Sequence, residues 1–248
     1  MSVYEYLMGV VKRRGAGYIV LIDPDKLSKK QIIHLVENAC SGGADAIFVG
    51  SSLILNSEFD GLVKVVKKAS TLPVILFPGN TMQISRHADA ILFLSLVSGR
   101  DPNYLIGEQV KAAPIIRHLG VEPISTGYML IESGRMTSAE FMSNTRPIPR
   151  DKIDIAKATA LAAEFLGMRL IYLEAGSGAL HPVLPEMIRE VTCYVKTPVI
   201  VGGGIRAAEE ARARVEAGAR FVVTGNILEK DSNRHLIPEI ADAVHFKE

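Results

Sequence analysis

The sequence is poor in cysteine, in long apolar runs and in surplus charge of either sign. Its 248 residues include two cysteines, Cys40 and Cys193, too few for a domain held together by disulfides. We expect both to be buried, reduced thiols in a cytoplasmic protein. No segment reaches the roughly 18 to 20 apolar residues of a membrane-spanning helix, and the N-terminus lacks a signal-peptide pattern.

The charges nearly cancel, because 28 Lys and Arg residues stand against 27 Asp and Glu, a formal net charge of +1. A protein that binds nucleic acid through bulk charge needs a basic surplus, so this class is excluded. Hydrophobic residues make up 48% of the chain, too many for a disordered protein. The segment Tyr4–Arg14 predicts a short amphipathic helix closing one end of the domain. Peripheral contact of this helix with a membrane surface is the alternative.

Eight short apolar segments recur along the chain, separated by segments with helical periodicity. Their nearly continuous apolarity is typical of parallel strands buried on both faces. The segments are Tyr18–Ile22, Ala46–Val49, Val74–Phe77, Ala90–Leu94, Val121–Ser125, Leu170–Leu173, Val199–Val201 and Phe221–Val223. Eight such strands predict one (β/α)8 TIM barrel over residues 1–248. A doubly wound sheet, with about five or six strands, is the second interpretation.

Two connections depart from the rhythm of a barrel. Helices are predicted at Ser28–Glu37, Phe59–Ala69, Asp151–Phe165 and Ala207–Glu216. Residues 78–89 are too few for a full crossover helix with its turns, so the third helix is expected to be lacking or replaced by a loop. The polar stretch Glu132–Arg150 between the fifth and sixth strands predicts a lid or an interaction surface.

Glycine-rich loops follow each of the last three predicted strands. The loops are Glu174-Ala175-Gly176-Ser177-Gly178, Gly202-Gly203-Gly204 and Thr224-Gly225-Asn226. Backbone N–H groups of such loops, with the helix N-termini that follow them, bind phosphate. Because the strands of a parallel barrel end at one face, the three loops predict a phosphate site there. The alternative is that each glycine only makes a tight turn.

Acidic and hydroxyl side chains follow the first two strands. Asp23, with Asp25 and Lys26 close by, follows the first strand, and Ser51 and Ser52 follow the second. A carboxylate at this position can hold Mg²⁺ together with substrate phosphate oxygens, whereas Asp23 or Asp25 could instead cap the next helix. The six histidines lack zinc-site spacing, and neither a nucleophile elbow nor a dinucleotide fingerprint is present.

These motifs, in this order and over nearly the whole chain, resemble geranylgeranylglyceryl phosphate synthases and their heptaprenyl relatives. The resemblance rests on the loops above, on Phe77-Pro78-Gly79-Asn80 and on Tyr172–Gly178. It implies transfer of a prenyl group, geranylgeranyl in the first place, from a prenyl diphosphate to the 3-hydroxyl of sn-glycerol 1-phosphate. It also implies a barrel that has lost its third helix, and Mg²⁺ held by Asp23 and Ser52. The implied glycerol phosphate site is Tyr172, Leu173, Glu174, Ala175, Gly176, Ser177, Gly178, Gly203, Gly204, Gly225 and Asn226.

The resemblance also implies a subgroup. Some members carry a lysine two positions before the first motif aspartate, where this chain has Leu21. This difference favours the longer of the two groups, whose members are homodimers or homohexamers. Phe141 stands where hexameric members tend to carry an aromatic residue, and a plain packing role is equally open.

The chemistry suggests roles for two residues at the sixth strand. Glu174 is the candidate general base for the glycerol hydroxyl, unless it forms a salt bridge with Arg206. Tyr172 would orient the glycerol or stabilise the developing allylic cation through its ring face. The prenyl tail needs an apolar groove, with candidates Leu94, Leu96, Val97, Tyr104, Met129 and Ile131.

Two other functions are compatible with the sequence. A sugar-phosphate isomerase or lyase shares the glycine loops but needs a catalytic lysine or paired aspartates inside the barrel, and no predicted strand contains a lysine. A barrel that only binds phosphate would form no product and would not depend on Mg²⁺.

Overall fold

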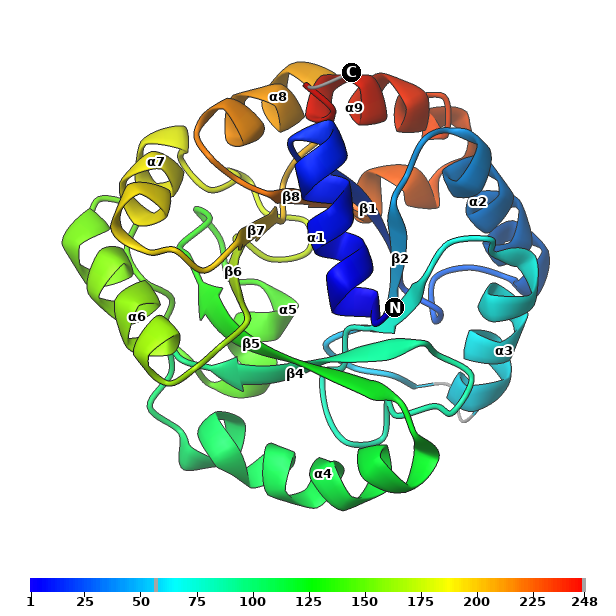
Figure 1. The fold of residues 1–248 in the computed structure, drawn as a ribbon, viewed down its shortest axis with the longest axis horizontal. Coiled ribbons are helices and arrows are strands. Elements are labelled where there is room, and N and C mark those ends of the chain that lie inside the picture. The colour runs from blue at the N-terminus through cyan, green and yellow to red at the C-terminus, as the bar shows by residue number, and fades with distance from the viewer. Residues whose placement is uncertain (56–57, 247–248) are drawn as a thin grey trace.

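The computed structural model describes residues 1–55 and 58–246. Eight parallel strands pair in chain order and close into a barrel (Figure 1). They are β1 (Gly17–Ile22), β2 (Ala46–Val49), β3 (Val74–Leu76), β4 (Ala90–Leu96), β5 (Glu122–Leu130), β6 (Leu170–Glu174), β7 (Val199–Gly202) and β8 (Phe221–Thr224). The predicted (β/α)8 barrel is therefore confirmed, and the doubly wound sheet was wrong.

Alternation along the strands divides the apolar side chains into two layers. Residues such as Ile19, Phe48 and Ile124 form the layer inside the barrel. Their neighbours, such as Val20 and Ile47, belong to the layer between the barrel and its helices. Burial on both faces explains why the strands lack the polar alternation of half-exposed strands.

The described chain forms α-helices, most of which surround the barrel, whereas α1 and α5 overlap its centre in Figure 1. They are α1 (Val3–Arg14), α2 (Lys29–Ser41), α3 (Phe59–Ala69), α4 (Glu108–Leu119), α5 (Ser138–Ser143), α6 (Ile153–Phe165), α7 (Pro185–Tyr194), α8 (Ala208–Glu216) and α9 (Leu236–Val244), with a π-helical turn at Asn103–Gly107. Ser28 caps α2 through a reciprocal capping box with Gln31, as its sequence predicts. Neither Asp23 nor Asp25 caps this helix.

The connection between β3 and β4 contains no helix. Residues 77–89, all described, form turns and irregular chain, which confirms the predicted loss of a crossover helix. Strand β5 is longer than predicted, because it pairs with β4 up to the Leu96–Tyr128 position. Thr126 and Gly127 hide this extension by interrupting the apolar run.

Helix α1 crosses the end of the barrel at which the strands begin (Figure 1). Leu7 is fully buried and joins the inner layer of the barrel. The N–H groups of Val3 and Tyr4 donate to Glu122 at the start of β5, over 2.5 and 3.1 Å. The predicted closing role of this segment is thus confirmed.

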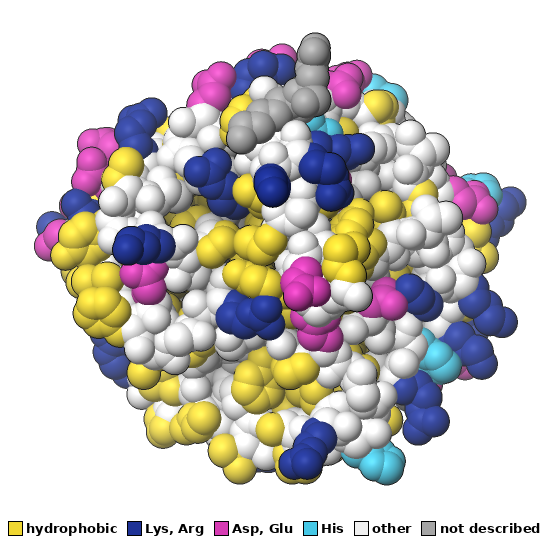
Figure 2. Space-filling model, viewed as in Figure 1, with side chains coloured by type: hydrophobic (Ala, Val, Ile, Leu, Met, Phe, Trp, Pro, Cys, Tyr) yellow, Lys and Arg dark blue, Asp and Glu magenta, His cyan; other side chains and the backbone are white. Residues whose placement is uncertain are grey.

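The outer surface is mixed in character. Basic and acidic side chains are interspersed on the face that carries α1 (Figure 2), in line with the small net charge. Both cysteines are free, but Cys40 is half-buried and Cys193 is exposed, so their predicted burial was wrong. Within the described chain, no helix is long and apolar enough to cross a membrane.

Truncating Leu7 tests the closing role of α1. We expect Leu7→Ala to lower the free energy of unfolding by about 3 kcal/mol, because it leaves a cavity in a fully buried layer. Lys12→Ala, at an exposed position of the same helix, should change it by less than about 0.5 kcal/mol. Urea unfolding measures the free energy of unfolding of both variants. A small loss in Leu7→Ala, similar to that in Lys12→Ala, would contradict the closing role of α1.

Candidate active site

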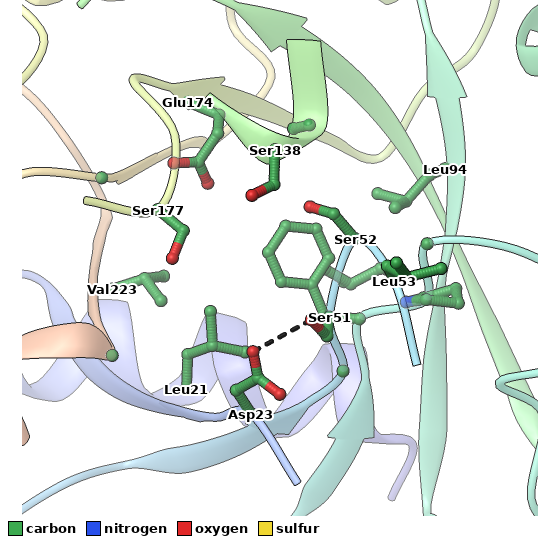
Figure 3. Close-up of a pocket in the computed structure, with 18 of the residues that line it drawn as sticks. Leu21, Asp23, Ser51, Ser52, Leu53, Leu94, Ser138, Glu174, Ser177 and Val223 are labelled. Atoms are coloured by element: carbon green, nitrogen blue, oxygen red, sulfur yellow. Dashed lines mark hydrogen bonds between the residues drawn. The ribbon is translucent and has the colours of Figure 1, made fainter. Parts of the chain in front are cut away.

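A cavity of about 760 Å³ opens at the end of the barrel where the strands terminate. Loops after most strands contribute to its walls. Figure 3 shows Glu174 and Asp23 entering it from different sides. Of the predicted residues, the lining includes Asp23, Ser52, Tyr172, Glu174, Ser177, Gly178, Gly203, Gly204, Gly225 and Asn226. Leu173, Ala175 and Gly176 do not line it, and the first two pack into the outer apolar layer.

The three glycine loops meet on one side of the cavity. Ser177 Oγ donates to Asn226 Oδ1 over 2.5 Å, which links the loop after β6 to the loop after β8. Gly203 adopts a φ of 84°, and a Cβ atom there would lie 2.5 Å from Glu174 Oε1. Glycine is therefore required at this position by both conformation and space. The three glycine loops therefore lie at one cavity, as predicted.

Glu174 is a buried carboxyl group in the wall of the cavity. Its side chain ends β6, is 6% exposed, and accepts a hydrogen bond from Gly176 N over 2.6 Å. Burial raises the pKa of the carboxyl group to about 7, although the Gly176 N–H acts in the opposite direction. The group can thus take up a proton near neutral pH.

The alternative partner of Glu174 is engaged elsewhere. Arg206 donates from Nη2 to the carbonyl oxygen of Ala179 over 2.7 Å. Among the described residues, no cation forms an ion pair with Glu174. The salt-bridge interpretation was therefore wrong, and the carboxylate is left with its pKa set by burial.

Aromatic rings form the floor of the cavity. Tyr172 is fully buried, and its ring stacks on Phe77 with centroids 5.1 Å apart. Tyr128 meets Tyr172 edge to face at 5.5 Å and Phe77 at 5.7 Å. Phe77 and Tyr128 are partly accessible and line the cavity, so more of their surface faces it than that of Tyr172. Only the position of Phe77 in a motif hinted at this role, and Tyr128 was missed.

Asp23 lies among hydroxyl groups on another side of the cavity. Its Oδ2 atom accepts from Ser51 Oγ over 2.9 Å and lies 3.5 Å from Lys26 Nζ. Ser51, and not Ser52, thus contacts the carboxylate (Figure 3). No group of three or more acidic, His or Cys side chains suited to a metal exists among the described residues. The donors fit Mg²⁺ only as a site shared with substrate oxygens, which is a common arrangement for this ion.

A polar chain joins the two sides of the mouth. Glu229 Oε1 accepts from Lys26 Nζ over 3.0 Å and from Asn226 Nδ2 over 2.9 Å. Because Asn226 also accepts from Ser177, the contacts run without a break from Asp23 to Ser177. Sequence reasoning missed Glu229, because the three contributing loops come together only in the fold.

An apolar slot extends the cavity sideways, beside α4. Its lining combines residues from both faces of β4 with the buried face of α4, at the place that the lost helix leaves open. The apolar lining residues here are Ile84, Ile91, Phe93, Leu94, Leu96, Ala112 and Ile116, with Tyr104 near the mouth. Leu94, Leu96 and Tyr104 were predicted for a groove. Val97, Met129 and Ile131 do not line it, and Met129 and Ile131 pack into the outer apolar layer instead.

Replacing Glu174 by Gln should stabilise the protein at alkaline pH. The folded state holds the Glu174 proton more tightly than the unfolded chain, whose reference pKa is 4.5. The wild-type free energy of unfolding therefore falls as pH rises from 4.5 to 7, by about 3 kcal/mol. Glu174→Gln lacks this loss and can still accept from Gly176. Urea unfolding from pH 5 to 8 measures the difference, and a pH-independent difference would contradict the raised pKa.

Comparison with known proteins agrees with this geometry. A family model described as the PcrB family matches residues 8–244. A protein of Chitinophaga pinensis named geranylgeranylglyceryl phosphate synthase is 48% identical over 95% of this chain and 94% of its own. A protein of the same name from Thermococcus gammatolerans is 48% identical over 86% and 84%.

A solved structure is also similar over the full length. It is the Thermoplasma acidophilum (S)-3-O-geranylgeranylglyceryl phosphate synthase in complex with its substrate sn-glycerol-1-phosphate. The TM-score is 0.94 at 36% identity, with 99% of each chain covered. The extent of these matches leaves one conclusion about descent: the chain belongs to the PcrB family.

Proposed function

We propose that the protein transfers a prenyl group, geranylgeranyl in the first place, from its diphosphate to the 3-hydroxyl of sn-glycerol 1-phosphate. The C–O bond to the diphosphate breaks with its electron pair, and an ether bond forms between the allylic carbon and the hydroxyl oxygen. The observation that carries the proposal is Glu174, a buried carboxylate that lines the same cavity as three glycine loops and an apolar slot. The names of the relatives support the same reaction.

The glycine loops would hold the phosphate of the glycerol substrate. Gly203, Gly204 and Gly225 bring backbone close to the cavity without side chains in the way. Such a wall binds an anion by N–H groups that are already oriented. The substrate would then extend its 3-hydroxyl toward Glu174, within reach of the allylic carbon.

Glu174 would accept the hydroxyl proton as the ether forms. A base is most effective when its pKa lies near the working pH, which the burial of Glu174 provides. Phe77 and Tyr128 line the same cavity as Glu174. Their ring faces would stabilise the positive charge that develops on the allylic carbon.

Asp23 would hold Mg²⁺ together with the diphosphate, with Ser51 or Ser52 adding a hydroxyl oxygen. The ion, when bound, supplies charge that stabilises the departing diphosphate. Lys26 lies beside Asp23 and adds a second positive charge to this side of the mouth. The diphosphate would thus lie on the Asp23 side of the cavity and the glycerol phosphate on the Glu174 side.

The prenyl tail would occupy the slot beside α4. Ile91, Ala112 and Ile116 line it and are otherwise almost entirely buried. The slot exists because no helix follows β3. The loss of this helix would therefore provide the space that the prenyl tail needs. None of the eight strands, all of them described, contains a lysine, which disfavours the isomerase or lyase alternative.

Subunit association and cellular location belong to the same proposal. Phe141 is 72% exposed on α5, which suits the subunit contact expected of a hexamer. Ile106 and Val110, next to and within α4, are further exposed apolar residues that a dimer would cover. We expect a cytoplasmic homo-oligomer, and light scattering would give its mass.

Substitution of Glu174 provides the main test of the reaction. Wild type, incubated with sn-glycerol 1-phosphate, Mg²⁺ and prenyl diphosphates of several lengths, should form a prenyl ether that mass spectrometry detects. Its kcat should rise with pH and level off above about 7, because only the ionised carboxylate accepts the proton. Glu174→Gln should lower kcat by about a thousandfold. Absence of an ether with every diphosphate, or near-normal turnover of Glu174→Gln, would contradict the proposal.

Substitution of Asp23 tests the metal. Asp23→Asn should raise the Mg²⁺ concentration for half-maximal activity by at least about tenfold, because it removes the charge that binds the ion. Asp25→Asn is the matched comparison and should raise this Mg²⁺ concentration less than Asp23→Asn does. The reason is that Asp25 Oδ2 already accepts from Leu55 N over 2.5 Å. Full activity of the wild type in excess chelator would show that no divalent ion is needed.

A further inference from the structure

We propose that Arg135 is a further substrate-binding residue, which contacts the phosphate of the glycerol substrate from the connection after β5. The inference rests on the proposed function, because it assigns a residue to the phosphate side of the same cavity. Arg135 lies in the long connection after β5, outside the glycine motifs. The packing of this connection against the glycine loop after β6 positions Arg135.

The connection after β5 lies directly on the glycine loop after β6. His181 N donates to Ser133 O over 3.1 Å. The ring of His181 covers Gly134, where a Cβ atom would lie 2.8 Å from His181 Cδ2. The side chain of Thr137, which is buried, occupies the space over Gly176. These contacts hold residues 133–137 against the loop predicted to bind phosphate.

Arg135 is the charged member of this contact. A Cβ atom at Gly178 would lie 2.5 Å from Arg135 Nη2, so the guanidinium rests on the backbone of the glycine loop. Gly178 itself lines the cavity. Arg135 does not itself line the cavity, but its exposed guanidinium lies against Gly178, a residue of the cavity wall in the loop predicted to bind the phosphate.

The guanidinium has no acidic partner. Among the described residues, it forms neither a hydrogen bond nor an ion pair. Two cations that line the cavity are engaged, since Lys26 binds Asp23 and Glu229 and Arg206 donates to Ala179 O. Lys230 also lines it, after the glycine loop that follows β8. In the described part of the chain, Arg135 is the cation whose guanidinium contacts Gly178, in the loop after β6, and is free to bind an anion.

A phosphate at this loop needs positive charge as well as N–H groups. The glycine loops carry no formal charge, whereas a phosphate monoester carries nearly two negative charges at neutral pH. Arginine offers a planar fork of donors that matches two phosphate oxygens, and charge-assisted bonds of this kind are strong. Since the phosphate lies away from the reacting hydroxyl, Arg135 would contribute to binding and little to the chemical step.

Kinetics of three variants test the assignment. Arg135→Gln should raise the KM for sn-glycerol 1-phosphate about tenfold, with kcat and the KM for the prenyl diphosphate within about twofold of wild type. Arg135→Lys should recover part of the loss, because it keeps the charge but not the fork. Arg146→Gln, an exposed arginine in the same connection, controls for general charge and should leave all constants unchanged. Equal effects of Arg135→Gln and Arg146→Gln, or none in either, would overturn the inference.

Binding of inorganic phosphate separates this inference from the proposed reaction. Calorimetry on the full chain, without any prenyl diphosphate, should give at least a fivefold weaker Kd for Arg135→Gln than for wild type and Arg146→Gln. Thermal unfolding should show equal Tm values, which excludes a folding defect. If no ether forms but phosphate binding still depends on Arg135, the reaction is wrong and the site stands. Unchanged phosphate binding in Arg135→Gln contradicts the site directly.

Discussion

Burial of one carboxylate is the constraint around which the mouth of this barrel is arranged. Glu174 ends an apolar strand, faces the cavity, and receives one backbone N–H from Gly176. Gly203 is held in a conformation that leaves room for it. Without an ion pair, the carboxylate titrates near neutral pH, which destabilises the fold and equips the site to accept a proton. Two apolar layers and a helix that closes the opposite end of the barrel offset that destabilisation.

The second constraint is the absence of a helix after β3. An ordinary barrel would cover β4 at this place, whereas here Ile91 and Phe93 reach a slot that α4 bounds on the other side. The high apolar content of the chain therefore fills the core and lines the slot, which is the path proposed for the lipid tail. In the proposed function, two anionic groups would be accommodated with a formal net charge of only +1, because backbone loops, the proposed metal site and a few placed cations would act locally.

Much of this arrangement could be predicted from the sequence, and the misses share one cause. Strands, glycine loops and the lost helix leave local signals, such as apolar runs and the short interval before β4. Met129 and Ile131 were predicted to line the groove but pack into the outer layer. Their direction follows from the alternation along β5 and just beyond it, and this strand extends further than its apolar pattern predicts. Glu229 and Tyr128 were missed because their partners lie in other strands or loops, far away in the chain. Contacts of that kind are properties of the closed barrel and leave no local pattern.

The titration of Glu174 tests the account most directly, since the acid–base role and the cost in stability both follow from it. Carbon-13 NMR of protein labelled at the glutamate side-chain carboxyl, with Glu174→Gln to assign the resonance, would follow this group in the folded protein. We expect the Glu174 carboxyl group to titrate with a midpoint near pH 7. A midpoint near the ordinary value of 4.5 would mean that water reaches the carboxylate, and it would contradict the proposed base.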